Sequence, residues 1–222
     1  MRTFTIPNIN IDFYQHPHSQ SVSEDAFNLY LKAKENIFSR KVDSVLDLGC
    51  GNGILLLMLA KDFHYLALTG VDILKELIDI AKLNFQRLSE YIKKAINFNL
   101  IVHDYGKKIE EFQNKKFDLI LSNPPYYKKS EGNISPIREK AIARFESTAT
   151  QNDLLSTIKS YLDINGKSFI VYPFSRKAEF EKNCSDLSLN ILSCEIVDYK
   201  NKLFDKLTSK DKLIFEIAHV TN

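Results

Sequence analysis

The chain has 222 residues, of which 44% are hydrophobic and 26% charged, with a net charge of +2. This length fits one α/β domain and excludes a second substantial one, and no apolar run reaches the roughly 18 residues of a membrane helix. The composition is typical of a soluble globular protein, and so mild a positive charge does not by itself indicate nucleic-acid binding.

Short β-rich runs alternate with helical patterns along the chain, which is typical of a parallel sheet with helices on both faces. Residues 1 to about 22 look irregular, and Ser23–Phe38 is predicted to be helical. The sequence then predicts seven strands, at Ser44–Leu48, Leu66–Asp72, Asn97–His103, Phe117–Asn123, Lys167–Pro173, Ile191–Asp198 and Lys212–Val220.

Two later helices are predicted between these strands. Apolar residues recur at three- and four-residue steps over Leu74–Ile92, and a second helix is predicted over Gln151–Leu162. We expect the second helix to stop at Asn165-Gly166, a pair suited to a left-handed cap. Only Lys200–Ser209 separates the last two strands, so we expect them to pair as an antiparallel hairpin.

The first predicted strand runs into a glycine-rich loop that opens a helix at Ile54. Asp47 precedes three glycines, spaced Asp-x-Gly-x-Gly-x-Gly: Gly49, Gly51 and Gly53. Glycines allow a sharp turn and a close approach of a ligand to the backbone. The helix N-terminus leaves free N–H groups that suit an anionic group of the ligand.

Asp72 ends the second predicted strand, where a carboxylate can accept the hydroxyl protons of a ribose. A nicotinamide-binding domain shares this logic, but its glycines follow the spacing G-x-G-x-x-G. The spacing G-x-G-x-G after Asp47 instead resembles motif I of the S-adenosylmethionine-dependent methyltransferases. That resemblance implies that the loop and Asp47 hold the methionine part, and that Asp104, after His103, binds the adenine amino group.

The fourth predicted strand ends in Asn123-Pro124-Pro125-Tyr126. Both prolines have φ held near −65° and no N–H, so they stop the strand and make its end rigid. The Asn123 side-chain oxygen and the Pro124 carbonyl can then point at one spot beyond the sheet. Two such acceptors would localise the lone pair of an amino nitrogen for methyl transfer, and Tyr126 offers a flat face for an unstacked base.

This tetrapeptide resembles motif IV of the amino-directed methyltransferases, which act on adenine N6, cytosine N4, guanine N2 or a protein glutamine amide. A longer stretch is similar to the transfer RNA adenine-37 N6-methyltransferases that modify a valine tRNA. The matching positions are Tyr14-Gln15, Ser23-x-Asp25, Asn123–Tyr127, Pro136-x-Arg138-Glu139, Ala143-Arg144-x-Glu146 and Asp153-Leu154-Leu155.

The resemblance implies a class I methyltransferase fold, with a Rossmann-like, seven-stranded and mostly parallel sheet that ends in the antiparallel hairpin. It implies methylation of N6 of an adenine in RNA, most specifically adenine 37 of a valine tRNA, with S-adenosylmethionine as donor and S-adenosylhomocysteine as product. Residues 1–40 would form an N-terminal extension and lead-in helix, and residues 41–222 the catalytic domain. Cofactor contacts are expected from Asp47, Gly49, Gly51, Gly53, Asp72, Ile73, Asp104 and Asn123.

By the same resemblance Asn123, Pro124 and Tyr126 are the catalytic residues. Five positive charges follow within seventeen residues, at Lys128, Lys129, Arg138, Lys140 and Arg144. Together with Tyr126 and Tyr127, which can stack on bases, they predict an RNA-binding segment made of Tyr126, Tyr127, Lys128, Lys129, Arg138 and Arg144. A solvated lysine-rich loop is the alternative, which the interspersed glutamates favour.

Other functions remain open at this point. A ribosomal RNA base or a protein glutamine amide offers the same amino chemistry, and a Rossmann-type scaffold without catalysis is a further alternative. A DNA methyltransferase usually carries a target-recognition domain for which 222 residues leave no space. Only residues 1–43 precede the first strand, whereas release-factor methyltransferases have a larger helical N-terminal domain. The oligomeric state is not predicted.

The cysteines and histidines indicate neither disulfides nor a metal. Cys50, Cys184 and Cys194 have no disulfide or zinc spacing, and His16-Pro17-His18 has no third ligand nearby. The N-terminus lacks the apolar core of a secretory signal. We therefore expect a cytoplasmic protein with no membrane segment and no metal, and the resemblance implies tRNA as its partner.

Overall fold

The computed structural model describes residues 2–5, 12–17, 24–126, 149–197, 207–208 and 211–220. The strands are β1 (Arg2–Thr5), β2 (Asp12–Gln15), β3 (Ser44–Leu48), β4 (Ala67–Asp72), β5 (Phe98–Val102), β6 (Phe117–Ser122), β7 (Leu162–Pro173), β8 (Leu189–Ile196) and β9 (Lys212–His219). The helices are α1 (Glu24–Ser39), α2 (Ile54–Asp62), α3 (Lys75–Ile92), α5 (Gln151–Tyr161) and α6 (Lys177–Asp186), with short 3₁₀ turns η1 (Glu110–Phe112) and η3 (Phe174–Arg176).

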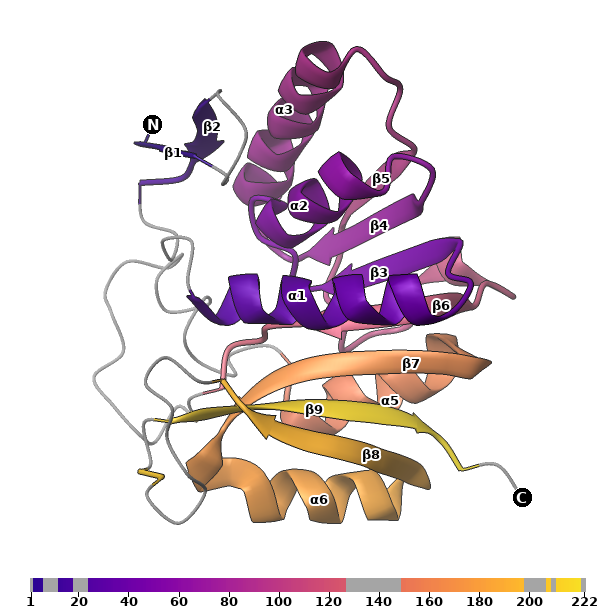
Figure 1. Cartoon of the computed structure of the whole chain (residues 1–222). Coiled ribbons are helices and arrows are strands. Elements are labelled where there is room, and N and C mark those ends of the chain that lie inside the picture. The colour runs from indigo at the N-terminus through magenta and orange to yellow at the C-terminus, as the bar shows by residue number, and fades with distance from the viewer. Residues whose placement is uncertain are drawn as a thin grey trace.

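Seven strands form one twisted sheet in the order β5-β4-β3-β6-β7-β9-β8 (Figure 1). The first five strands of this order pair in parallel. Strand β9 lies between β7 and β8 and is antiparallel to both. The predicted α/β architecture with an antiparallel C-terminal hairpin is therefore confirmed.

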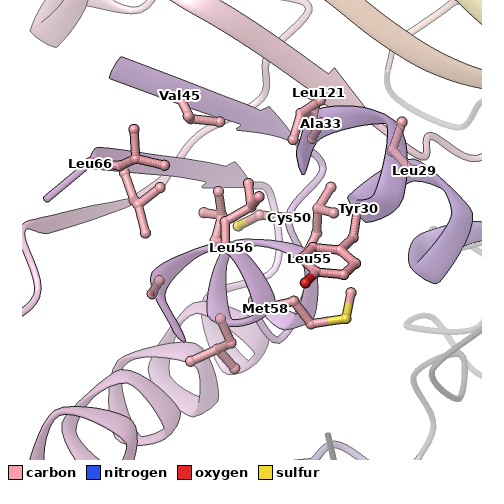
Figure 2. Packing of buried hydrophobic residues seen from close by; sticks show 14 of the residues in the cluster. Leu29, Tyr30, Ala33, Val45, Cys50, Leu55, Leu56, Met58, Leu66 and Leu121 are labelled. Atoms are coloured by element: carbon pink, nitrogen blue, oxygen red, sulfur yellow. The ribbon is translucent and has the colours of Figure 1, made fainter. Parts of the chain in front are cut away.

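Helices cover both faces of the sheet because alternate residues of the strands point to opposite sides. In β3, Val45 belongs to the core shared with α1, α2 and α3, whereas Leu46 and Leu48 belong to the core shared with α5 and α6. Helix α2 is apolar around its circumference. Figure 2 shows its Leu56 beneath the sheet, near Cys50, and its Leu55 and Met58 beside Tyr30 of α1.

The predicted left-handed cap at Asn165-Gly166 is wrong. Helix α5 ends at Tyr161, and strand β7 follows at once from Leu162. Gly166 lies within that strand, next to an irregularity in the pairing with β6. A Cβ there would lie 2.8 Å from Leu162 Cδ1 and 3.0 Å from the carbonyl oxygen of Phe117, so the glycine serves a close approach and not a turn.

The N-terminal residues are more regular than the sequence predicts. Strands β1 and β2 pair antiparallel, and β2 is bound to α3 through one side chain. Asn84 Oδ1 accepts from the Tyr14 N–H at 2.7 Å, and Asn84 Nδ2 donates to the Tyr14 carbonyl at 2.9 Å. The fully buried Asn84 thus acts as a neighbouring strand would. Strands of only four residues show too little alternation of apolar and polar residues to be predicted from the sequence.

Helix α1 agrees with the predicted helix to within one residue at each end. Helix α6 was not predicted, because in its ten residues only Phe180 and Cys184 are buried and the apolar repeat is too short to recognise. The division of the chain at residue 40 stays a prediction.

Candidate active site

The predicted site residues lie at the carboxyl ends of four neighbouring strands. In the sheet order β5-β4-β3-β6, Asp104 follows β5, Asp72 ends β4, Gly49 follows β3 and Asn123 follows β6. These strands are parallel, so their carboxyl ends share one edge of the sheet, which is where ligands bind in this architecture. The fold therefore brings the predicted motifs to one edge.

The glycine-rich loop after β3 depends on backbone conformations that favour glycine. Gly49, Gly51 and Gly53 have φ of 79°, 56° and 80°. A Cβ at Gly51 would meet no atom within 4 Å, so this part of the loop faces open space. At Gly49 the nearest atom to such a Cβ is Tyr105 Cε1, at 3.8 Å. The loop is thus a turn with an open outer side that a ligand can approach.

The N–H groups of the loop are engaged more fully than the sequence predicts. Gly49 and Cys50 donate to the Val71 carbonyl at 2.8 and 3.0 Å, and Gly53 donates to the Cys50 carbonyl at 2.9 Å. Helix α2, by contrast, starts without a hydrogen bond from a capping side chain. The amides of its first turn, and not those of the loop glycines, are the donors suited to an anionic group.

Asp47 is a buried carboxyl group at this edge, and its pKa is strongly raised. It lies in the interior of β3, is 3% exposed, and accepts no hydrogen bond from any described residue. Burial, together with the negative charge of Asp72, raises the pKa of the Asp47 carboxyl to about 8. An unpaired buried carboxylate is costly, so a cation brought beside it would be bound tightly. The amino acid ammonium of S-adenosylmethionine is such a cation, and Asp47 therefore fits the expected cofactor.

Asp72 holds the loop as well as ending β4. Its Oδ2 accepts from the Gly51 N–H at 2.8 Å and its Oδ1 from the Leu74 N–H at 2.9 Å. Burial raises the pKa of Asp72 although these backbone hydrogen bonds oppose the shift. Ile73 is half-buried between the two bonded residues. The ribose contact assigned to Asp72 stays a prediction. The structure shows that Asp72 also fixes the glycine-rich loop through the Gly51 N–H.

Asp104 and Tyr105 form the next part of the edge. Asp104 Oδ1 accepts from the Gly106 N–H at 3.0 Å, and 14% of its side chain is exposed. The Tyr105 carbonyl accepts from Thr157 Oγ1 at 2.7 Å, which ties this turn to α5. With the Tyr105 ring beside Gly49, the turn flanks the glycine-rich loop. The adenine contact assigned to Asp104 stays a prediction.

One buried hydrogen bond joins the tetrapeptide to the glycine-rich loop. Ser122 Oγ donates to the Leu48 carbonyl at 2.7 Å, and both residues are buried. Ser122 immediately precedes Asn123, and Leu48 immediately precedes Gly49. Asn123 is half-buried and Pro124 is buried. The two sequence motifs therefore start side by side, through a serine that the sequence motif did not single out.

Tyr126 differs from the open stacking platform that the sequence predicts. The residue is 8% exposed, and the Tyr172 ring lies edge-on to its ring at 6.4 Å between centroids. Lys212 Nζ donates to the Tyr126 hydroxyl and lies 4.4 Å from the ring centroid. The main chain of Tyr126 is also bound, because Arg176 Nη1 donates to its carbonyl at 3.0 Å. These contacts bury the ring, so stacking on a base stays a prediction for the RNA-bound state.

The other residues predicted to bind RNA lie outside the described part of the chain; they are Tyr127, Lys128, Lys129, Arg138 and Arg144.

The structure adds site residues that the sequence did not reveal. Arg176 and Lys212 contact Tyr126 from distant segments, and Asn84 Nδ2 donates to the Asn52 carbonyl of the glycine-rich loop at 3.3 Å. None of them belongs to a recognisable motif, because each contacts residues that are distant from it in the sequence.

Within the described ranges, no group of three or more His, Cys, Asp or Glu residues is placed to hold a metal ion. The helices described here include none that combines the length and apolar character needed to cross a bilayer.

Residues 39–219 match the model of a family described as methyltransferase domain. A tRNA1(Val) (adenine(37)-N6)-methyltransferase of Flavobacterium johnsoniae is 29% identical over 146 residues, 66% of this chain and 59% of that protein. The protein of the same name from Histophilus somni is 26% identical over 168 residues, 75% of this chain and 67% of its own length. The predicted resemblance to this group is confirmed, over a part of each relative.

Among solved structures, an S-adenosylmethionine-dependent methyltransferase from Clostridium acetobutylicum has a similar fold. It superposes with a TM-score of 0.61 at 14% identity, covering 89% of this chain and 92% of that one. The predicted class I fold is confirmed by this likeness.

Proposed function

The chain belongs to the methyltransferase domain family, and from this premise we propose that it methylates the N6 amino group of an adenine in RNA, most specifically adenine 37 of a valine tRNA. The observation that carries the proposal is the 2.7 Å hydrogen bond from Ser122 to the Leu48 carbonyl. It joins the start of the amino-directed tetrapeptide to the start of the glycine-rich loop. The proposed sites for the methyl acceptor and for the methyl donor are therefore neighbours.

Four features of the chain would hold the cofactor. The buried Asp47, which accepts no hydrogen bond from the described residues, would bind the ammonium, and the open outer side of Gly51 would let the ligand lie on the backbone. Asp72 would accept from the ribose hydroxyls, and Asp104 from the adenine amino group. S-adenosylmethionine supplies, when bound, an electrophilic methyl group on a sulfonium sulfur.

Asn123 and Pro124 would do the chemistry by accepting hydrogen bonds. The amino nitrogen of adenine is a weak nucleophile because its lone pair is delocalised into the ring. Asn123 Oδ1 and the Pro124 carbonyl would each accept one amino hydrogen, which localises the lone pair on nitrogen. The nitrogen would gain the methyl group as the sulfonium C–S bond breaks, which leaves S-adenosylhomocysteine. The methylated nitrogen would be acidic and would lose one proton to water, so no strong base is needed. Fixed dipoles and positioning then account for catalysis.

An RNA substrate is favoured by the relatives and by the cost of presenting the base. Both relatives are named for adenine 37 of a tRNA. A loop base is already partly unstacked, so less free energy is needed to bring it to the tetrapeptide. The basic residues at Lys128, Lys129, Arg138 and Arg144 would contribute phosphate contacts.

Incubation with labelled S-adenosylmethionine and a panel of acceptors tests the proposal. The panel would contain total tRNA, ribosomal RNA and a release factor, and nucleosides from labelled RNA would be identified by mass spectrometry. We expect N6-methyladenosine in tRNA. Label in a protein amide or in another nucleoside would reject the adenine assignment and leave methyl transfer to a different amino group.

Replacing Asp72 by alanine is expected to weaken cofactor binding by about 10- to 100-fold, since hydrogen bonds between a charged group and a ligand contribute roughly 1.5–3 kcal/mol. The variant loses the acceptor for ribose and also the hydrogen bonds to Gly51 and Leu74. Titration calorimetry with S-adenosylhomocysteine measures the change. The exposed carboxylate Asp79, which pairs with Lys75 on α3, gives a matched control in Asp79→Ala. Unchanged affinity in Asp72→Ala would remove its assignment as a ligand.

A further inference from the structure

We propose that Tyr126 is anchored from two sides, by Arg176 on its main chain and by Lys212 on its hydroxyl, and that both cations are positioning residues for methyl transfer at Asn123 and Pro124. The inference rests on the proposed function and gives the C-terminal part of the sheet a task in it. Neither cation needs to touch the substrate, because each acts through Tyr126.

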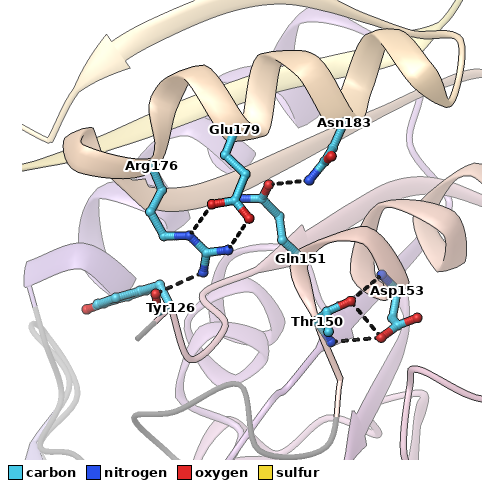
Figure 3. Close-up of polar contacts among 7 residues, drawn as sticks. All are labelled: Tyr126, Thr150, Gln151, Asp153, Arg176, Glu179 and Asn183. Carbon is cyan, nitrogen blue, oxygen red and sulfur yellow. Dashed lines mark hydrogen bonds and ion pairs between the residues drawn. The ribbon is translucent and has the colours of Figure 1, made fainter. Parts of the chain in front are cut away.

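The first anchor is a guanidinium fixed in one orientation. Arg176 ends η3 and is 5% exposed. Its Nε and Nη2 donate to Glu179 at 3.1 and 2.9 Å, while Nη1 donates to the Tyr126 carbonyl at 3.0 Å (Figure 3). The planar fork of arginine makes such a paired contact directional. The guanidinium also lies 5.3 Å from the Tyr172 ring centroid, which limits its movement.

A hydrogen bond from α6 also binds the first residue of α5. Asn183 Nδ2 donates to Gln151 Oε1 at 2.7 Å. Figure 3 shows Arg176, directly before α6, and Glu179 and Asn183 of α6 pointing toward Tyr126 and Gln151. Their spacing of three and four residues places these side chains on one helix face. Residue 126 and residue 151 flank the segment with the predicted RNA contacts. Arg176 of η3 therefore binds the described chain on one side of that segment, and Asn183 of α6 binds it on the other.

The second anchor is an ammonium shared between two partners. Lys212 is the first residue of β9, and its Nζ donates to the Tyr126 hydroxyl and to Asp25 Oδ2. Asp25 lies in the first turn of α1, with 8% of its side chain exposed. Burial opposes the charged form, but the hydrogen bonds to Asp25 and Tyr126 outweigh it and raise the pKa of Lys212. The ammonium is therefore charged at neutral pH and binds the hydroxyl firmly.

Fixing Tyr126 also fixes the two acceptors. Asn123 and Tyr126 are separated only by Pro124 and Pro125, whose φ angles are held near −65° by their rings. The tetrapeptide is thus a conformationally restricted segment. Ser122 binds it at one end, and Arg176 and Lys212 bind it at the other. A misplacement of about 1 Å at a reacting centre can lower the rate about 100-fold, so loosening one end should be measurable.

The test uses conservative variants and separates kcat from binding. We expect Arg176→Lys and Tyr126→Phe each to lower kcat about 10-fold or more per bound cofactor, with the Kd and stoichiometry of S-adenosylhomocysteine unchanged within twofold. Lys177→Met is the matched control, because Lys177 is the neighbouring cation and pairs with Glu181 within α6. Unchanged kcat in Arg176→Lys would overturn the first anchor. A fall in activity that is fully explained by a smaller amount of bound cofactor would overturn it as well.

A double-mutant cycle tests the second anchor. If Lys212 acts through the hydroxyl, Lys212→Met lowers kcat in the wild-type background and adds less than twofold in the Tyr126→Phe background. Additive losses would overturn that assignment. The rates are measured on whichever acceptor the wild type labels, so failure of the tRNA assignment is seen in the wild type alone.

Hydrogen exchange gives a readout that does not depend on activity. The peptide covering residues 117–126 should exchange faster in Arg176→Lys and Tyr126→Phe than in the wild type, and at the wild-type rate in Lys177→Met. Equal exchange in all four proteins would overturn the proposal even if no acceptor were labelled.

Discussion

Replacing Asn123 by alanine is expected to lower kcat for methyl transfer by about 100-fold or more, the usual effect of deleting one preorganised hydrogen-bonding group from a transition state. The side chain would accept one of the two amino hydrogens, and without it the lone pair stays delocalised. Cofactor affinity should stay within about threefold, because Asp47, Asp72 and Asp104 remain. Single-turnover rates with saturating labelled cofactor, alongside titration calorimetry, measure the two quantities.

Asn99→Ala is the matched control for this prediction, since Asn99 is an exposed asparagine on β5 of the same sheet. Its kcat should equal that of the wild type. Wild-type turnover in Asn123→Ala would remove the proposed mechanism, whereas equal losses of kcat and of cofactor binding would show that Asn123 supports the fold.

Cofactor binding is expected to release about one proton per site at pH 6.5, because the pKa of Asp47 in the free protein is about 8. Below pH 8 the free carboxyl is protonated, and a bound ammonium favours its ionised form. Affinity should therefore rise about tenfold from pH 6 to pH 7 and about fivefold from pH 7 to pH 8. The other titratable groups facing Asp47 are Asp72 and Cys50, and burial raises the pKa of both.

Calorimetry in two buffers of different ionisation enthalpy counts the released protons. Asp47→Asn should bind the cofactor more weakly at pH 8 and release no proton at pH 6.5. Proton release that persists in Asp47→Asn would assign the titration to another group and contradict the pairing with an ammonium.

The same raised pKa has a consequence for stability. The folded Asp47 holds its proton more tightly than the unfolded chain, whose carboxyl has the ordinary pKa of 3.8. Its contribution to the free energy of unfolding is therefore full below pH 4 and is lost as pH rises toward 8. Ionising this carboxyl in the free protein destabilises the fold, and the cofactor's ammonium removes that penalty.

The sequence predicted the parts of this molecule that depend on local patterns. Strand β3 was placed to the residue because Asp47-Leu48-Gly49 marks its end, and the terminal hairpin followed from a connection too short for a helix. The glycine-rich loop and the tetrapeptide were recognised because their chemistry requires particular residues at fixed spacing.

The features that the sequence missed are those set by tertiary contacts. The sequence around Gly166 predicts a helix cap, but this residue lies in β7, which pairs with β6. Asn84 reads as an ordinary helix residue, yet it supplies both partners for the Tyr14 main chain. Tyr126 was recognised as important, but its burial by Arg176 and Lys212 could not be foreseen, because these residues lie about 50 and 86 positions away.

The most direct test is a crystal structure of the chain with S-adenosylhomocysteine and a tRNA anticodon stem-loop. The proposal predicts that the adenine N6 lies within about 2.7–3.2 Å of both Asn123 Oδ1 and the Pro124 carbonyl oxygen. An Asn123 side chain turned away from that nitrogen, or side chains filling the space beside Gly51, would contradict it.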